Sequence, residues 1–325
     1  MASALAPSTR SSYSTGWACY VTFCLQSRIN PTPFNQDWIM AFIVHAKDSL
    51  HLAPATIRLY LSGIQHQFRL MSINSPTLLS IPAVRLLLRG ISKCSPAPSS
   101  ARLPISIDIL SKLISILRHG CFSPFDDLTM EVICLSAFLG FLRCSEYTVP
   151  SIASFPTLGI RCSDLKLIPD SHFILFLRIS KTDQLRQGQC IQLSKINSPL
   201  CPFTSMLKYI AERKAISSSD PLFINSSRSI VSRHWFSTHL STVVSRAGLP
   251  SQFYTPHSFR IGAATSAAKA NINQHLIKNM GRWTSSAVES YIRSSSSEIS
   301  SAHQSIASMS GVGTTFLPEP PKISP

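Results

Sequence analysis

The chain has few acidic residues and no long apolar run. Only 15 of its 325 residues are Asp or Glu, against 30 Lys or Arg, which gives a net charge of +15 and a pI near 9.7. No apolar run reaches the length of about 18 residues that a membrane helix needs, and residues 1–30 contain no apolar signal core. The sequence therefore predicts neither a membrane span nor secretion.

The sequence also lacks paired cysteines. Its nine cysteines are scattered, their count is odd, and no two of them form a Cys-x-x-Cys pair. Several stand in apolar stretches, where a thiol behaves as a small apolar residue. This pattern is typical of a reduced, intracellular protein, and we expect neither a disulfide framework nor a zinc site.

The surplus of positive charge is not a by-product of a highly charged surface, because only 14% of the residues are charged. It is also unevenly spread: residues 1–100 hold eight Lys or Arg and two acids, whereas residues 294–325 hold one Lys and two Glu. General solubility is one explanation. A protein that neutralises phosphates is the other, and it makes the N-terminal part a candidate to face nucleic acid.

The length predicts two domains and a tail. Residues 1–95 contain four segments with helical patterning, and residues 96–103 are rich in Pro and Ser, which is typical of a linker. Residues 104–293 read as mostly helical with a small sheet near 160–195. Residues 294–325 are rich first in Ser and then in Pro, which predicts a flexible tail. The four helices are expected at residues 8–26, 35–49, 54–71 and 81–93.

The third of these helices has the clearest pattern. Its apolar residues recur at helical spacing and form a narrow stripe of Ile57, Leu61, Ile64 and Phe68. One residue further on, a polar stripe consists of Arg58, Ser62, Gln65 and Arg69. The polar stripe is either an ordinary solvated face or a surface that presents Arg58 and Arg69 to DNA.

The segment from Thr255 to Tyr291 carries the candidate chemistry. Thr255 and Pro256 predict a helix start, so His257 and Arg260 lie at i and i+3 on its first turn. That turn has unpaired N–H groups and a partial positive charge, which favour a phosphate nearby. An isolated His-x-x-Arg motif is more often structural than catalytic, so it indicates a catalytic site only together with further residues.

The rest of that segment predicts two more helices. The first stops at Gly281, which we interpret as the left-handed glycine that follows a helix. Ser286 with Glu289 resembles a capping box that opens a short helix with Tyr291 on it. A lone Tyr on an amphipathic helix is usually a core residue with a hydrated hydroxyl.

Two upstream residues add to this pattern. The apolar run 128–142 predicts a buried helix that ends in Arg143, and Glu146 follows three residues later. Arg143 is either paired with Glu146 or faces a ligand, since an unpaired charge at a core helix is costly. Residues 172–194 predict a β-hairpin whose turn contains Gly188, with Lys181 at the end of the first strand. A hairpin Lys on its own is usually solvated.

Taken in order, four motifs resemble the tyrosine recombinase (phage integrase) family. They are LRCSEY around Arg143, SKTDQLRQG around Lys181, TPHSFRIGAAT around His257 and Arg260, and GRWTSSAVESYIR with Tyr291. Within the family the chain is most similar to recombinases of eukaryotic mobile elements of the DIRS, Ngaro and Crypton kind. The resemblance covers Ala4 to Arg293. It implies a mainly α protein of the DNA breaking-rejoining enzyme fold, with a helical, SAM-like core-binding domain and an α-rich catalytic domain that contains a small β-sheet.

The resemblance also implies roles for single residues. Tyr291 would be the nucleophile that forms a 3′-phosphotyrosyl link. Arg143 and Arg260 would bind the non-bridging phosphate oxygens. Lys181 would protonate the leaving 5′-oxygen, and His257 would assist as a general acid or base. No metal and no other cofactor is implied.

The chain departs from the family at one position. Many members have a His or Trp directly after the glycine that lies ten residues before the nucleophile. Here Arg282 follows Gly281, and Trp283 comes next. Either Arg282 or Trp283 could fill that place, by hydrogen bonding to the phosphate or by packing.

As partners, the resemblance implies double-stranded DNA and a homotetramer on two duplexes, and as a location the nucleus, although no compact basic import cluster stands out. The alternatives are a domesticated DNA-binding protein that no longer cuts, a relaxing enzyme like type IB topoisomerases, and a protein whose basic surface binds RNA or acidic partners. The intact set of core residues argues against the first, the N-terminal helices against the second, and the lack of an RNA-module signature against the third.

Overall fold

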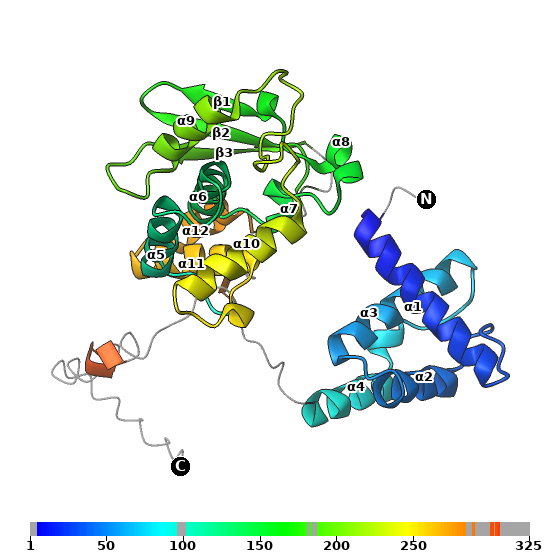
Figure 1. Cartoon of the computed structure of the whole chain (residues 1–325). Coiled ribbons are helices and arrows are strands. Elements are labelled where there is room, and N and C mark those ends of the chain that lie inside the picture. Colours follow the sequence, from blue (N-terminus) through cyan, green and yellow to red (C-terminus); the bar gives the residue numbers. More distant parts are fainter. Residues whose placement is uncertain are drawn as a thin grey trace, which may run out of the picture. The chain divides into compact units, whose positions relative to one another are not determined.

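The structure, a computed structural model, describes residues 5–95, 102–180, 183, 187–283, 288–289, 300–301 and 303–305. The chain forms two compact units, Met1–Ser99 and Ser100–Pro325 (Figure 1). Within the described ranges, none of the helices has the length and apolar character needed to cross a membrane.

The first unit is helical, as predicted. Proline occupies the first turn of three of its helices, where the missing N–H costs nothing, and Asn35 caps the remaining one. The elements are α1 (Pro7–Gln26), α2 (Gln36–Asp48), α3 (Pro54–Leu70), the short 3₁₀ turn η1 (Leu78–Ser80) and α4 (Pro82–Cys94).

The core of this unit forms around α3. The predicted apolar stripe is confirmed, because Ile57, Leu61, Ile64 and Phe68 are all fully buried. Arg58 and Arg69 are exposed. The placement of Gln65 on the polar stripe was wrong, since its side chain is buried and bonds the hydroxyl of Ser75 and the N–H of Leu78. A partner for each amide group is what makes that burial tolerable.

The second unit is built around one buried helix, α6 (Pro124–Leu139), which packs against α5, α9 and α11. Twelve of the sixteen residues of α6 are buried, in keeping with the apolar run that predicted it. The other helical elements are α5 (Ile107–Arg118), α7 (Cys144–Tyr147), η2 (Ile152–Ser154), α8 (Phe155–Leu158), η3 (Cys162–Asp164), α9 (Pro202–Arg213), α10 (Arg233–Arg246), η4 (Ser251–Phe253), α11 (Pro256–Lys269) and α12 (Gln274–Gly281).

The sheet of this unit has three antiparallel strands in the order β1 (Leu165–Ile168), β2 (His172–Leu177), β3 (Gln189–Ser194) (Figure 1). The predicted hairpin is confirmed, because β2 pairs with β3 from His172 opposite Ser194 to Leu177 opposite Gln189. Alternate residues of β2 point inward and join the core of the unit. The mainly helical fold with a small sheet is therefore as the sequence predicted.

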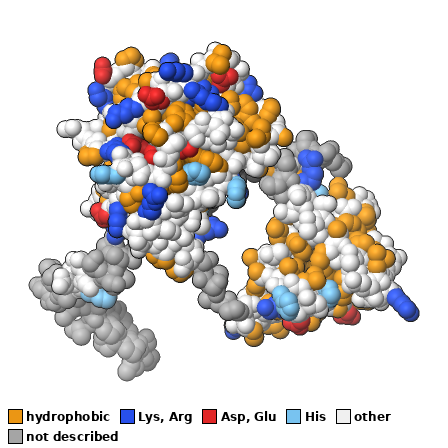
Figure 2. Space-filling view, viewed as in Figure 1, with side chains coloured by type: hydrophobic (Ala, Val, Ile, Leu, Met, Phe, Trp, Pro, Cys, Tyr) orange, Lys and Arg blue, Asp and Glu red, His pale blue; other side chains and the backbone are white. Residues whose placement is uncertain are grey.

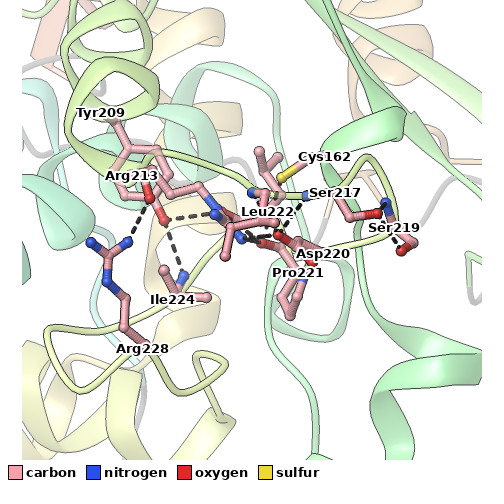
Figure 3. Close-up of polar contacts among 11 residues, drawn as sticks. Cys162, Tyr209, Arg213, Ser217, Ser219, Asp220, Pro221, Leu222, Ile224 and Arg228 are labelled. Atoms are coloured by element: carbon pink, nitrogen blue, oxygen red, sulfur yellow. Dashed lines mark hydrogen bonds and ion pairs between the residues drawn. The ribbon is translucent and has the colours of Figure 1, made fainter.

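Helix α9 is fastened to the segment that follows it by a group of buried polar contacts (Figure 3). The Tyr209 hydroxyl donates to the carbonyl of Leu222 at 3.0 Å and accepts from the N–H of Ile224 at 3.0 Å. The Arg213 guanidinium donates to the carbonyls of Pro221 and Leu222. Since these groups are buried, the contacts satisfy backbone atoms that have no strand partner.

Candidate functional site

Two loops of the second unit meet at the predicted site. The first follows α6 and runs through Phe141 to Arg143, and the second follows α12 and contains Arg282. Phe141 and Arg282 both adopt left-handed backbone conformations, with φ of 51° and 56°. Each of these residues follows a helix, where a left-handed residue commonly closes the last turn.

Arg260 joins the two loops. Its guanidinium donates from Nη1 to the carbonyl of Phe141 and from Nη2 to the carbonyl of Gly281. The residue is 1% exposed, and the indole of Trp283 lies 4.1 Å from its guanidinium carbon, a distance that permits a cation–π interaction. Two backbone bonds and a stacked ring fix the plane of this cation.

The helix that carries Arg260 begins where the sequence predicted. Thr255 is the N-cap of α11 and Pro256 its first residue, and the hydroxyl of Ser258 accepts from the N–H of Thr255. His257 is half-buried on the same first turn as Arg260.

The prediction for Gly281 was wrong. Helix α12 includes Gly281, and the left-handed residue after the helix is Arg282. A Cβ added to Gly281 would lie 1.6 Å from Cζ3 of Trp283. The glycine is therefore required by the close approach of the indole ring rather than by its own backbone angles.

The predicted end of the apolar helix was also wrong. Helix α6 ends at Leu139, and the N–H of Leu142 bonds back to the carbonyl of Ala137, which closes the helix after a left-handed Phe141. Arg143 is not the last residue of this helix. It is the N-cap of the short helix α7.

Arg143 is held by Glu146, the ion pair that the sequence left open as an alternative. Its Nη1 lies 3.0 Å from Oε1 of Glu146, and its backbone N–H donates to Oε2 at 2.8 Å. The Arg143 side chain is 16% exposed, whereas that of Glu146 is 1% exposed. Arg143 is thus the more accessible of the two arginines that were predicted to bind phosphate.

Arg282 turns toward the same carboxylate. Its Nη2 lies 2.7 Å from Oε2 of Glu146 and 3.2 Å from the carbonyl of Phe141, and its Nη1 donates to the carbonyls of Gly140 and Met280. Burial lowers the pKa of the Arg282 guanidinium from its ordinary value; the charge of Arg143 acts in the same direction, and Glu146 opposes both. Of the two residues after Gly281, Arg282 points to Glu146 and Trp283 stacks on Arg260.

The structure therefore brings together Arg143, Arg260, Arg282 and Trp283, with His257 on the same helix turn as Arg260. Lys181 and Tyr291 lie outside the described residues, as does Ser286 of the predicted cap. Arg58 and Arg69 belong to the first unit, where they are exposed on α3.

Three participants were not assigned to the site from the sequence: the carbonyls of Phe141 and Gly281, and Glu146 as a ligand shared by two arginines. Backbone carbonyls carry no sequence signal. Within the part of the chain that the structure describes, no three His, Cys, Asp or Glu side chains gather so that they could hold a metal ion.

No family model matches the sequence, and no curated protein matches it. Solved structures do match. A XerH site-specific recombinase bound to a palindromic difH substrate in a post-cleavage complex has 14% identity and a TM-score of 0.65, over 90% of this chain and 78% of that one.

Two further solved structures also match this chain. The Tn1549 transposon integrase in complex with transposon right end DNA has 12% identity and a TM-score of 0.58, over 92% of this chain and 99% of that one. A lambda integrase dimer bound to a COC′ core site has 14% identity and a TM-score of 0.55, over 89% and 72%. The chain therefore has the fold of the tyrosine recombinases and integrases, and at these identities the likeness concerns the fold.

Proposed function

We propose that this protein is a site-specific DNA recombinase or integrase of the tyrosine class, derived from a mobile element. The observation that carries the proposal is that Arg143 and Arg260, from separate helices, both lie at the loops that follow α6 and α12. The fold is shared with solved recombinases and integrases. Its closest relatives would be the recombinases of eukaryotic mobile elements of the DIRS, Ngaro and Crypton kind.

In the proposed reaction, the hydroxyl of Tyr291 attacks the scissile phosphorus. A bond forms between the tyrosine oxygen and the phosphorus, and the bond from the phosphorus to the 5′-oxygen breaks. Arg143 and Arg260 bind the non-bridging oxygens, and their planar forks stabilise the charge that builds in the pentavalent transition state.

Two proton transfers complete the step. Lys181 donates a proton to the leaving 5′-oxygen, and His257 assists the loss of the tyrosine proton. The phosphotyrosyl bond retains the energy of the phosphodiester, so the 5′-hydroxyl of another strand can reverse the attack. Strand exchange would then need no ATP.

The rest of the molecule would serve DNA binding. The first unit would be the core-binding domain, with Arg58 and Arg69 of α3 toward the phosphates, and Ser100–Pro325 would contain the catalytic domain followed by the tail. A homotetramer would hold two duplexes, and the nucleus would be the place of action.

Covalent trapping tests the proposal. The protein is incubated with nicked suicide duplexes drawn from the repeats that flank its own gene, and the products are separated on a denaturing gel. Wild type should give a shifted covalent band, and Tyr291→Phe should give none while keeping nearly the same DNA affinity. Tyr254→Phe removes a hydroxyl from the same unit and should keep the band.

The other functions predict different outcomes. A DNA-binding protein that no longer cuts would give salt-sensitive binding and no band on any of these duplexes. A relaxing enzyme would relax supercoiled plasmid as one duplex and would not exchange strands between two labelled duplexes. Loss of DNA binding in Tyr291→Phe would contradict the assignment of the nucleophile.

A further inference from the structure

Arg282 is an unusual residue to find where it lies. Its side chain is 7% exposed, its backbone is left-handed, and its Nε is buried without a hydrogen-bond partner among the described residues. Each of these features costs free energy. A left-handed residue is an ordinary end of a helix, as at Lys214 after α9, so the buried guanidinium is the feature that points to a role for Arg282.

Its two Nη atoms bond four groups of the protein. Besides Glu146, they are the carbonyls of Gly140, Phe141 and Met280. This fork joins the loops that follow α6 and α12 to the Glu146 carboxylate. The arrangement suits a residue that holds other groups in place.

The carboxylate of Glu146 is divided between two arginines. Its Oε2 accepts from Arg282 at 2.7 Å and from the backbone N–H of Arg143. Only Oε1 meets the Arg143 guanidinium, at 3.0 Å from Nη1. Arginine and carboxylate favour a bidentate pair with two parallel bonds, and here Arg282 occupies the oxygen that the second bond would need.

This division has an electrostatic consequence. The side chains of Arg143, Arg282 and Glu146 together carry a net charge of +1, and the Glu146 side chain is 1% exposed. If Arg282 were neutral, Glu146 and Arg143 would form a one-to-one buried pair, and a phosphate would have to compete with Glu146 for the guanidinium. With Arg282 present, Arg143 is oriented by one bond and keeps its charge for a ligand.

We propose that Arg282 is a positioning residue: through Glu146 it orients Arg143 and prevents its bidentate closure onto that carboxylate. This deepens the proposed function and rests on it. Arg282 also bonds the Phe141 carbonyl that receives Arg260, so the two phosphate-binding arginines share one support.

The first test uses two suicide duplexes that differ in one substituent on the scissile phosphorus. One carries the scissile phosphate, and the other carries a methylphosphonate, in which a methyl group replaces a charged oxygen. A variant that has lost the charge of Arg143 at the phosphate is slowed more on phosphate than on methylphosphonate. Loss of fold slows both reactions alike, so the ratio of the two rates reports on the cation.

Arg282→Met should shift this ratio toward methylphosphonate by about tenfold or more, in the direction of Arg143→Ala, which sets the scale. Arg282→Lys restores the charge without the fork and should shift it less. The matched control is Arg213→Met, because Arg213 is another buried arginine that bonds backbone carbonyls, far along the chain from this loop. It should leave the ratio unchanged.

A second measurement needs no DNA cleavage. In protein labelled with ¹⁵N-arginine, Arg143→Lys identifies the guanidinium signals of Arg143, and Arg282→Met should move them while Arg213→Met does not. Unmoved signals would overturn the inference whether or not the protein cuts DNA. Moved signals without any covalent band in wild type would leave the positioning role standing and remove the proposed function. A normal covalent band in wild type, with an unchanged rate ratio in Arg282→Met, would support the proposed function and overturn the positioning role.

Discussion

Gly281 lies beneath the indole ring of Trp283, and this contact decides which residue can stand there. A Cβ at Gly281 would lie 1.6 and 2.0 Å from two ring carbons of Trp283. The ring would have to move, and it would then leave its place 4.1 Å from the Arg260 guanidinium. The conflict involves a buried aromatic side chain, so it cannot be relieved by the swing of a flexible end.

We therefore expect Gly281→Ala to lower the free energy of unfolding by about 1–3 kcal/mol, the usual cost of overpacking, and to reduce covalent trapping. Gly90 of α4 is the control, because a Cβ there meets nothing within 4 Å. Gly90→Ala should raise stability by about 0.5–1 kcal/mol, as alanine does inside a helix. Urea titration of both variants measures the effects, and equal stability of the two would contradict the packing explanation.

Single residues show what sequence reasoning can and cannot give. The N-cap Thr255 and the proline after it mark the start of α11 without ambiguity. Gly281 was misassigned because a glycine after a helix has two explanations, a left-handed angle or a close neighbour, and only the position of Trp283 separates them. Gln65 was misplaced because its partners, Ser75 and Leu78, lie outside α3.

Among the helices and strands, periodic burial made α3 and the hairpin predictable, and a continuous apolar run did so for α6. The buried stripe of α3 and the alternating burial of β2, which pairs with β3, follow from apolar spacing. Helix α7 did not, because its four residues are too few to show a period. It matters to the site nonetheless, since its turn brings Glu146 within hydrogen-bond distance of Arg143.

The hydrogen bonds between helix α9 and the segment after it should stabilise the fold to a degree that depends on pH. The hydroxyl of Tyr209 bonds Leu222 and Ile224 (Figure 3), and burial raises the pKa of Tyr209 to about 12. The folded state therefore keeps the proton more tightly than the unfolded chain, whose tyrosine titrates near 10. The stabilisation is fully present below pH 10 and is lost as the pH rises toward 12.

Tyr209→Phe should lower the free energy of unfolding by about 1–3 kcal/mol near pH 7, because it leaves the buried N–H of Ile224 without its partner. Above pH 10 the difference between wild type and variant should narrow, since wild type alone loses the contribution of this hydroxyl. Urea titrations of both proteins from pH 7 to pH 11.5 measure this difference in the free energy of unfolding. A difference that stays constant over this range would show that Tyr209 does not titrate with unfolding.

Net charge is the property of this protein that its sequence gives most directly. The net charge of +15 comes with only 15 acidic residues. Figure 2 shows Lys and Arg side chains scattered over the visible face of the second unit rather than gathered in one patch. In the first unit, Arg58 and Arg69 are eleven residues apart on α3, which is about three helical turns, so they share one face. A shared face is what a helix needs to follow a phosphate backbone.

If α3 contacts DNA, each of these arginines releases counterions when the protein binds. Arg58→Gln and Arg69→Gln should each weaken binding at low salt and reduce the slope of log affinity against log salt by about 0.9. Lys195→Gln is the charge-matched control, because Lys195 pairs with the exposed Asp170 beyond β3 in the second unit. It removes the same charge and should leave the slope nearly unchanged. Fluorescence anisotropy on one duplex at several salt concentrations measures all three variants. Equal slopes for the arginine variants and the control would mean that the polar stripe of α3 is a solvated face, and that the DNA contacts of this unit lie on another of its helices.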